Sequence, residues 1–168
     1  LEEKGAVSLE SKLGDLMPLF KNSNKKNITL KKMLSHYAQL KPWIPFYYAT
    51  LDSLTKKPDP KYYRTSKTKG FNVEVTNTLF MRDDYKDSIQ NIIRDSELLS
   101  SLRYRYSDLP YYILKNYLEG FYDKSLSAIT QDRFYSPLGA NYTTYNPRDK
   151  FSLKDIVPTE VDDYYRFK

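Results

Sequence analysis

The sequence contains no cysteine and only one histidine, and this scarcity excludes several kinds of functional site. Without cysteine the chain can form neither a disulfide nor a thiolate metal site. Because His36 is the only imidazole, zinc sites built from two or three histidines are excluded, and a Ser-His-Asp triad would depend on this one residue. We therefore expect neither a metal ion nor another cofactor.

Long hydrophobic runs are missing as well. No apolar stretch approaches the roughly 18 residues that a membrane-spanning helix needs, so we expect no membrane span. The 168 residues suffice for one domain and are too few for two. The chain is rich in aromatic side chains instead, with 17 Tyr and 8 Phe, which can fill a core while the tyrosine hydroxyls reach water. We therefore expect residues 1–168 to form a single folded unit.

The net charge of +6 raises the question of a nucleic-acid partner. The excess is local, because residues 1–70 hold 14 lysines and arginines against 6 acidic residues, whereas residues 71–168 hold 13 against 15. Its densest part is a polar turn that contains Lys21, Lys25, Lys26, Lys31 and Lys32. Such a turn predicts a solvated loop, with a phosphate-binding face as the alternative. We expect no nucleic-acid partner, and a cationic nucleic-acid binder is the weakest of our functional hypotheses.

Hydrophobic periodicity predicts four or five helices. Their expected N-caps include Thr29, Asp83–Asp84 and Ser125. The helix after Asp108 is the most apolar, so we expect it to be buried on most sides and to end at Gly120. The helix after Ser125 should bury Leu126, Ile129 and Phe134.

Two further segments have contrasting patterns. Residues 71–80 alternate between apolar and polar and are rich in β-branched residues, which predicts a small β-hairpin. Residues 56–70 are rich in Lys, Pro, Thr and Ser, which indicates a mobile surface loop. Residues 161–168 alternate enough to begin another strand.

An aromatic loop is expected between residues 39 and 48. Pro42 and Pro45 flank Trp43, and this spacing suits neither a helix nor a central strand. Trp43 and Tyr47 are candidate substrate-binding residues, because their rings could line a cleft. Packing of the aromatic rings beneath the loop is the alternative, and the pattern alone favours it.

Four segments, taken in order, resemble one enzyme superfamily. Residues 1–9 resemble the run L-V-E-E-G-K-L-S-L-D, and residues 28–40 resemble I-T-I-R-H-L-L-T-H-T-S-G-L. Residues 106–114 resemble Y-S-N-L-G-Y-x-L-L, and residues 134–139 resemble I-F-x-P-L-G-M. All four are found in serine hydrolases of the β-lactamase and penicillin-binding-protein superfamily, most closely in its class C-like, esterase-related branch. The resemblance covers nearly the whole chain.

This resemblance implies a mainly α fold, namely the helical subdomain of the β-lactamase/transpeptidase-like fold with a small β-hairpin and without the main sheet. In the family order the S-x-x-K motif lies upstream of Leu1, and the K-T-G or H-x-G strand lies beyond Lys168. We therefore expect a fragment that is truncated at both ends and whose partner is the remaining α/β part of the parent chain. The implied substrate is a small molecule or peptidoglycan-like, and the implied location is periplasmic or secreted in the bacterial envelope.

Residue by residue, the family's Y-x-N motif falls on Tyr106 and Asp108, which become the candidate catalytic residues. A phenol acts as a base only where its environment favours the phenolate, and an ionised Asp108 nearby would raise the pKa of Tyr106 instead. The alternative for Asp108 is an N-cap, since Pro110 suits the first turn of the helix that follows. His36 aligns with a histidine of the family that we interpret as structural.

Ser-x-x-Lys occurs three times, at Ser23, Ser53 and Ser66, but always in polar, loop-like sequence that cannot hold a buried nucleophile. The leading hypothesis is therefore a fragment of a serine hydrolase that is inactive alone. Its intact parent would cleave an amide or ester through an acyl-serine. The alternative is a non-catalytic binding or scaffolding module that keeps the helical fold.

Overall fold

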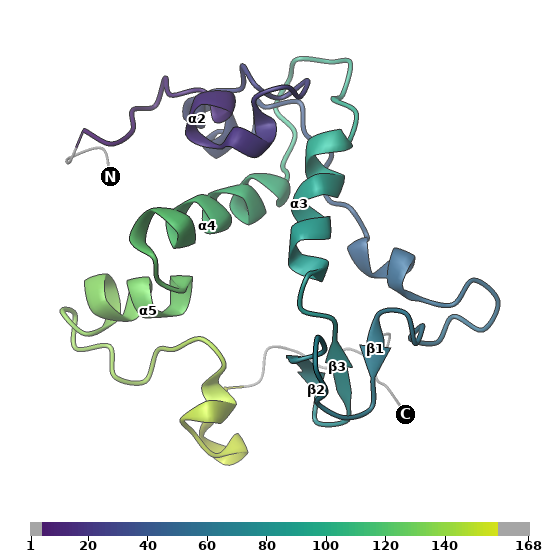
Figure 1. Cartoon of the computed structure of the whole chain (residues 1–168). Coiled ribbons are helices and arrows are strands. Elements are labelled where there is room, and N and C mark those ends of the chain that lie inside the picture. Colours follow the sequence, from purple (N-terminus) through teal and green to yellow (C-terminus); the bar gives the residue numbers. More distant parts are fainter. Residues whose placement is uncertain (1–4, 158–168) are drawn as a thin grey trace. The chain divides into compact units, whose positions relative to one another are not determined.

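The computed structural model describes residues 5–157, which divide into two compact units at Tyr117 and Leu118 (Figure 1). The first unit contains α1 (Leu13–Leu16), η1 (Pro18–Phe20), α2 (Leu30–Leu34), η2 (Phe46–Thr50), β1 (Tyr63–Arg64), β2 (Val73–Thr76), β3 (Leu79–Met81), α3 (Tyr85–Asp95) and the first part of α4 (Leu109–Tyr122). The second contains the end of α4, α5 (Leu126–Thr130), the π-helical turn η3 (Gln131–Tyr135), and the 3₁₀ turns η4 (Pro147–Asp149) and η5 (Leu153–Asp155).

The core of the first unit gathers the helices that the periodicity predicts. Its buried residues are Leu13, Met17, Phe20, Ile28, Leu30, Met33, Ala38, Leu40, Ile93, Leu109 and Ile113. Thr29 is the N-cap of α2 as predicted, and its hydroxyl accepts the N–H of Lys32 at 3.3 Å. Since α2 has only five residues, its burial in this core rather than its own hydrogen bonds stabilises it.

The predicted hairpin is present, and a third strand joins it. β2 and β3 pair antiparallel, with a bulge between Glu74 and Thr76, and β1 adds to the other side of β3. β1 lies inside the segment expected to be mobile, where a strand of two residues has no period to detect. It is anchored because the buried Tyr63 hydroxyl lies 2.7 Å from the hydroxyl of Thr50. The mobility of the other residues of this segment stays a prediction.

The start of α3 is where the sequence predicts it, but the expected cap is wrong. Asp84 occupies the N-cap position, yet its side chain makes no capping hydrogen bond. Its two carboxylate oxygens instead accept hydrogen bonds from the guanidinium of Arg82. A bidentate, charge-assisted pair of this kind is stronger than a single bond to a backbone amide. Asp83 similarly accepts hydrogen bonds from the backbone and the side-chain amide of Asn72.

Two expectations about α4 are wrong. The helix does not end at Gly120 but continues to Tyr122, and the next residue, Asp123, has the left-handed conformation at φ 48° that usually ends a helix. The helix is also not buried on most sides, because Tyr111 and Tyr112 remain 51% and 43% exposed. A tyrosine-rich sequence reads as apolar although its rings can remain half in water.

In the second unit Ser125 is the N-cap of α5 as predicted, and its hydroxyl accepts the N–H of Ala128 at 3.2 Å. Ile129 is buried, but Phe134, which we expected to be buried, is 56% exposed. Phe134 follows Ile129 by five residues, which at about 3.6 residues per turn places it on another side of the helix, and the π-helical turn η3 does not bring it back to the buried face. The strand expected at residues 161–168 lies outside the described residues.

Lys25 contradicts the interpretation of the polar turn as wholly solvated, because its side chain is completely buried. Its ammonium group donates to Asn24 Oδ1 at 2.8 Å, to the carbonyl oxygen of Arg94 at 3.1 Å and to that of Ser96. These carbonyls are at the C-terminal end of α3, where the helix dipole favours a cation. Burial lowers the pKa of Lys25. The turn is therefore part of the core, whereas Lys21, Lys26, Lys31 and Lys32 are exposed.

Candidate functional site

The segment that carries Tyr106 is held against residues 36–42 by hydrogen bonds. The backbone N–H of Arg105 donates to the carbonyl of His36 at 2.9 Å, and that of Asp108 donates to the carbonyl of Pro42 at 2.9 Å. Between them, the hydroxyl of Ser107 donates to the carbonyl of Lys41 at 2.6 Å. Both segments are irregular, so these bonds rather than a helix or strand determine how Tyr106 is presented.

Tyr106 and Asp108 share one exposed side of this segment. Ser107 between them is 2% exposed, whereas Tyr106 is 57% exposed and Asp108 is also exposed. The Ser107 hydroxyl also accepts the N–H of Leu109 at 3.2 Å, so a side chain other than Asp108 bonds a free amide at the start of α4. The structure thus brings the two candidate catalytic residues together at the N-terminus of α4.

The pKa of Tyr106 is shifted in the direction that the sequence predicts for this pair. The negative charge of Asp108 is the main cause that raises the pKa of Tyr106 above its ordinary value near 10. Tyr106 therefore keeps its proton at neutral pH. With only the described residues around it, the Tyr106 hydroxyl is suited to donate a hydrogen bond and not to act as a base.

His36 positions Tyr106. Its Nδ1 accepts the backbone N–H of Ser107 at 3.3 Å, and its ring centroid lies 4.6 Å from that of Tyr106. These contacts agree with the structural role expected for this histidine. Two residues in this turn, His36 and Gln39, have left-handed φ values of 60° and 55°. Gln39 stands where the family segment has glycine, and its backbone and side chain both bond to Leu99, which offsets the strain.

Sequence reasoning missed two tyrosines at this site. Tyr104 and Tyr111 have ring centroids 5.9 and 6.2 Å from that of His36, and both are more than half exposed. Together with Tyr106 they pack around the histidine, and the ring centroid of Tyr37 lies 6.0 Å from that of Tyr104. The available signal was the repeat of tyrosine at positions 104 and 106, which in an extended segment places both rings on one side.

The two candidate substrate-binding aromatics differ in position. Trp43 directly follows Pro42, whose carbonyl accepts the N–H of Asp108, and Trp43 is 57% exposed. It is therefore next to the Tyr106 segment and is not packed beneath the loop. Tyr47 lies on η2, where its ring centroid is 4.5 Å from that of Tyr48.

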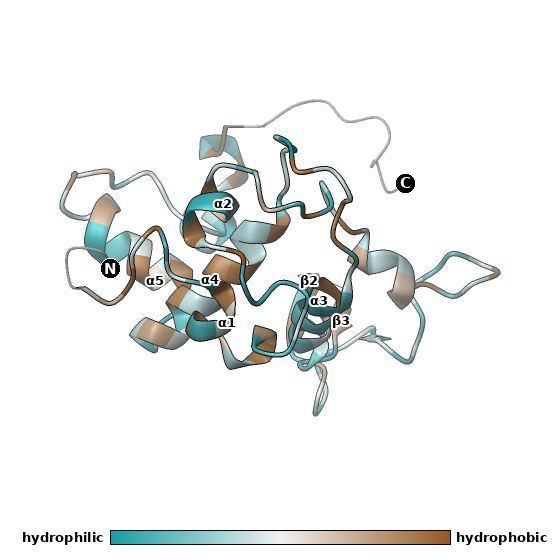
Figure 2. Cartoon of the chain, turned by 90° about the horizontal axis from the view of Figure 1, so that it is seen from above, coloured by the Kyte–Doolittle hydropathy of each residue, from teal (hydrophilic) through white to brown (hydrophobic). Residues whose placement is uncertain are grey.

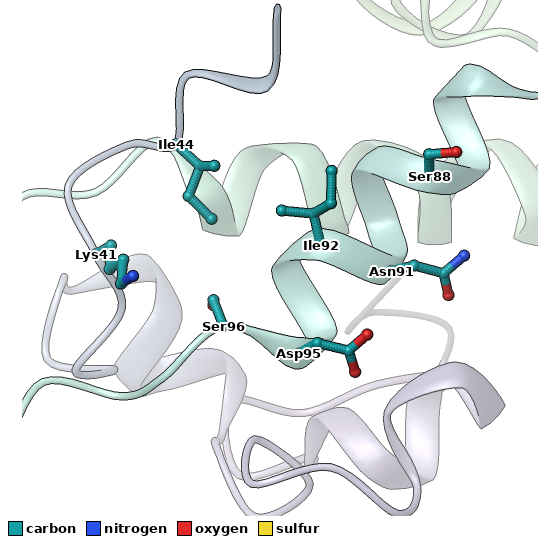
Figure 3. Close-up of a pocket in the computed structure, with 7 residues that line it drawn as sticks. All are labelled: Lys41, Ile44, Ser88, Asn91, Ile92, Asp95 and Ser96. Atoms are coloured by element: carbon teal, nitrogen blue, oxygen red, sulfur yellow. The ribbon is translucent and has the colours of Figure 1, made fainter. Parts of the chain in front are cut away.

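A hollow of about 520 Å³ lies between residues 41–44 and α3 (Figure 3). Ile44 and Ile92 line it from these two sides, and Lys41, Asn91 and Asp95 supply polar groups. The carboxylate of Asp95 is already paired with Arg94, with 2.7 Å between Nε and Oδ1. None of the four candidate site residues lines this hollow.

Neither metal-binding nor membrane-spanning features are found between residues 5 and 157. In that range no three His, Asp or Glu side chains are grouped closely enough to hold a metal ion. No helix in that range has both the length and the apolar character needed to cross a bilayer.

Comparison with known proteins shows the family of the chain. A sequence model of the β-lactamase family matches residues 1–156. The chain belongs to the β-lactamase family. No curated protein sequence matches it.

Two solved structures share the fold of this β-lactamase-family chain. A class C β-lactamase from Rhodobacter sphaeroides matches with a TM-score of 0.51 and 18% identity, over 82% of this chain and 30% of that chain. An octameric penicillin-binding protein homologue from Pyrococcus abyssi matches with a TM-score of 0.55 and 16% identity, over 90% of this chain and 31% of that chain. The chain thus corresponds to about a third of the length of these structures, and the described residues form a partial β-lactamase fold.

Proposed function

We propose that the chain is the helical subdomain of a β-lactamase-related serine hydrolase and supplies one wall of its active site. The observation that carries this proposal is the presentation of Tyr106 and Asp108 on one exposed side, at the N-terminus of α4, by a segment bonded to residues 36–42. Nucleophile and main sheet would belong to the remaining α/β part of the parent chain. The parent would act in the bacterial envelope, either periplasmic or secreted.

In the parent, a serine hydroxyl would attack the carbonyl carbon of an amide or ester. The serine proton passes to a base and then to the leaving group, and the acyl-serine that forms is hydrolysed by water. Within this scheme Tyr106 is suited to hold or deliver a proton at its phenolic oxygen. Because Asp108 favours the protonated phenol, Tyr106 becomes a base only when cations from the rest of the parent approach it.

Trp43 would bind the substrate. Trp43 is exposed and follows Pro42, whose carbonyl accepts the N–H of Asp108, so its ring can cover an apolar part of a small-molecule or peptidoglycan-like substrate. Tyr47 would extend this surface from η2. Hydrogen bonds from the Tyr106 segment would then orient the scissile group.

Labelling with a fluorescent penicillin, followed by intact-mass measurement, tests the proposal. The chain alone should acquire no adduct, whereas the parent, with the segment encoded upstream of Leu1, should acquire one on a serine of an S-x-x-K motif. Tyr106→Phe in the parent should slow acylation by about 10²-fold, the typical contribution of a proton-transfer residue. A stoichiometric adduct on any serine of the chain alone would contradict the proposal.

A second candidate function is a non-catalytic binding or scaffolding module. It is favoured by Asp108, which stands where the family motif has asparagine and which opposes the phenolate form of Tyr106. The upstream segment separates the two candidates. A parent without Ser-x-x-Lys at the start of an apolar helix would be a binding module.

A further inference from the structure

A loop between η2 and β1 presents a leucine to solvent. Residues 52–57, here called the tip loop, extend away from the neighbouring elements of the first unit, and their end is hydrophobic (Figures 1 and 2). Leu54 is the one apolar residue of the tip loop, and it is 89% exposed. Lys56 and Lys57 follow it and are exposed as well.

The tip loop is held in one conformation by its own hydrogen bonds. The carboxylate of Asp52 accepts the N–H of Leu54 at 3.1 Å, and both the N–H and the hydroxyl of Thr55 at 2.7 and 2.8 Å. At the base of the loop, the N–H of Asp52 donates to the carbonyl of Lys57 at 2.9 Å. Lys56 has a left-handed φ of 57°, and its N–H donates to the carbonyl of Asp52. The loop therefore presents Leu54 without collapsing around it.

Cations predominate on the surface behind the tip loop, where Asp83 and Asp84 lie near Lys61 but already accept hydrogen bonds from Asn72 and Arg82. Exposed cations in and after the loop are Lys56, Lys57, Lys61, Arg64, Lys67 and Lys69. The two acidic residues of the same stretch, Asp52 and Asp59, are partly buried and turned toward backbone amides, Asp59 toward the N–H of Lys61 at 2.7 Å. Lys57, Lys67 and Lys69 form no ion pair with any residue between 5 and 157. This surface is therefore available to an anionic partner.

We propose that the tip loop and the cations behind it bind the surface of an anionic lipid bilayer, with Leu54 inserted among the acyl chains. Lysines near such a surface are attracted by its negative potential, and an apolar side chain beside them gains by leaving water. Nucleic acid would satisfy the lysines equally well but offers nothing to an aliphatic tip. Leu54 thus decides in favour of lipid.

Co-sedimentation of the chain with vesicles provides the test, using phosphatidylcholine with and without 30% phosphatidylglycerol. We expect binding to the anionic vesicles only, weakening as salt is raised. The double variant Lys56→Gln, Lys57→Gln should weaken binding to the anionic vesicles by about 25-fold, because each lysine contributes a factor of about five. Leu54→Ser should weaken it by about tenfold.

Matched controls are available in the same unit. Lys31→Gln with Lys32→Gln removes the same charge from α2, and Leu102→Ser removes another exposed leucine, which is 64% exposed. Both control variants should keep most of the binding. The proposal fails if the wild-type chain does not bind anionic vesicles, or if the controls lose as much affinity as the loop variants. It also fails if Leu54→Ser binds unchanged, or if a DNA duplex binds as tightly as the vesicles.

Discussion

Two regions of the first unit use similar residues in opposite ways. Residues 51–81, the hairpin region, contribute nothing to the buried core cluster, and Tyr63 is their only buried side chain. The core region, which comprises residues 5–50 and 82–117, contains the whole cluster and also the Tyr106 segment. Both regions are rich in lysine, yet the core region buries Lys25 whereas the hairpin region exposes every one of its cations.

The difference shows what decides the position of a lysine. Lys25 is buried because one side-chain oxygen and two carbonyls at the end of α3 meet at its ammonium group. A buried ammonium group without such partners would be very unfavourable. In the hairpin region every lysine is exposed, and none of their ammonium groups has such a set of acceptors among the described residues. Local acceptors, not composition, separate the two regions.

The largest expected effect is that of Lys25→Met. The substitution keeps the aliphatic stem but leaves the carbonyls of Arg94 and Ser96 without their donor, so we expect a loss of about 2–4 kcal/mol in the free energy of unfolding. Lys57→Met, the matched change in the hairpin region, should alter it by less than about 0.5 kcal/mol. Urea denaturation followed by circular dichroism measures both. Equal losses in the two variants would remove the distinction between the regions.

The pH dependence provides an independent check on Lys25. Because burial lowers its pKa, the unfolded state binds the proton more tightly than the folded state in the interval between the lowered value and the ordinary 10.5. In this interval, the contribution of Lys25 to stability should rise with pH. The stability difference between wild type and Lys25→Met should therefore grow as pH approaches 10.5 from below. A difference that shrinks in this interval would show that Lys25 is not desolvated.

A smaller effect is expected from two glycines, one in each region. A Cβ at Gly14 would lie 2.9 Å from Cβ of Lys26 and 3.1 Å from its Cα and carbonyl oxygen, so the backbone of the turn must shift. We expect Gly14→Ala to cost about 2 kcal/mol through overpacking. Gly70 has open space around it, and Gly70→Ala should cost about 1 kcal/mol through its φ of +81° alone. Thermal unfolding of both variants shows which loses more stability, and a larger loss in Gly70→Ala than in Gly14→Ala would contradict this account.

Structural features that depend on neighbouring residues in the sequence were predictable, whereas features that depend on residues far along the chain were not. The N-caps Thr29 and Ser125 were predicted because a capping hydroxyl bonds to an amide only three residues away. The buried state of Lys25 was not predicted, because its acceptors lie about 70 residues further along the chain. The exposure of Phe134 was missed although its offset of five residues from Ile129 does not fit one face of an α-helix.

The candidate site was likewise predictable only in part. Its two central residues came from a motif of three consecutive positions, and the direction of the pKa of Tyr106 came from the presence of Asp108 in that motif. The contribution of residues 36–42 could not be read from either segment alone. Part of it consists of backbone N–H groups bonded to backbone carbonyls, which nearly every residue type provides, and the side-chain bonds of His36 and Ser107 join segments about 70 residues apart in the chain.

The smallest expected effect is a change in the pKa of Tyr106, which lies beside the exposed carboxylate of Asp108 in the core region. Asp108→Asn removes the main cause that raises the pKa of Tyr106, so this pKa should fall toward its ordinary value. The measurement is a pH titration of the tyrosine ring carbons by NMR, with Tyr106→Phe to assign the signal. Asp59→Asn in the hairpin region is the matched control and should leave the Tyr106 signal unchanged. Because both residues of the pair are exposed, the stability of the chain should change little. If the pKa of Tyr106 does not move in Asp108→Asn, the carboxylate does not control the proton of this phenol, and the argument from Asp108 for a non-catalytic module loses its basis.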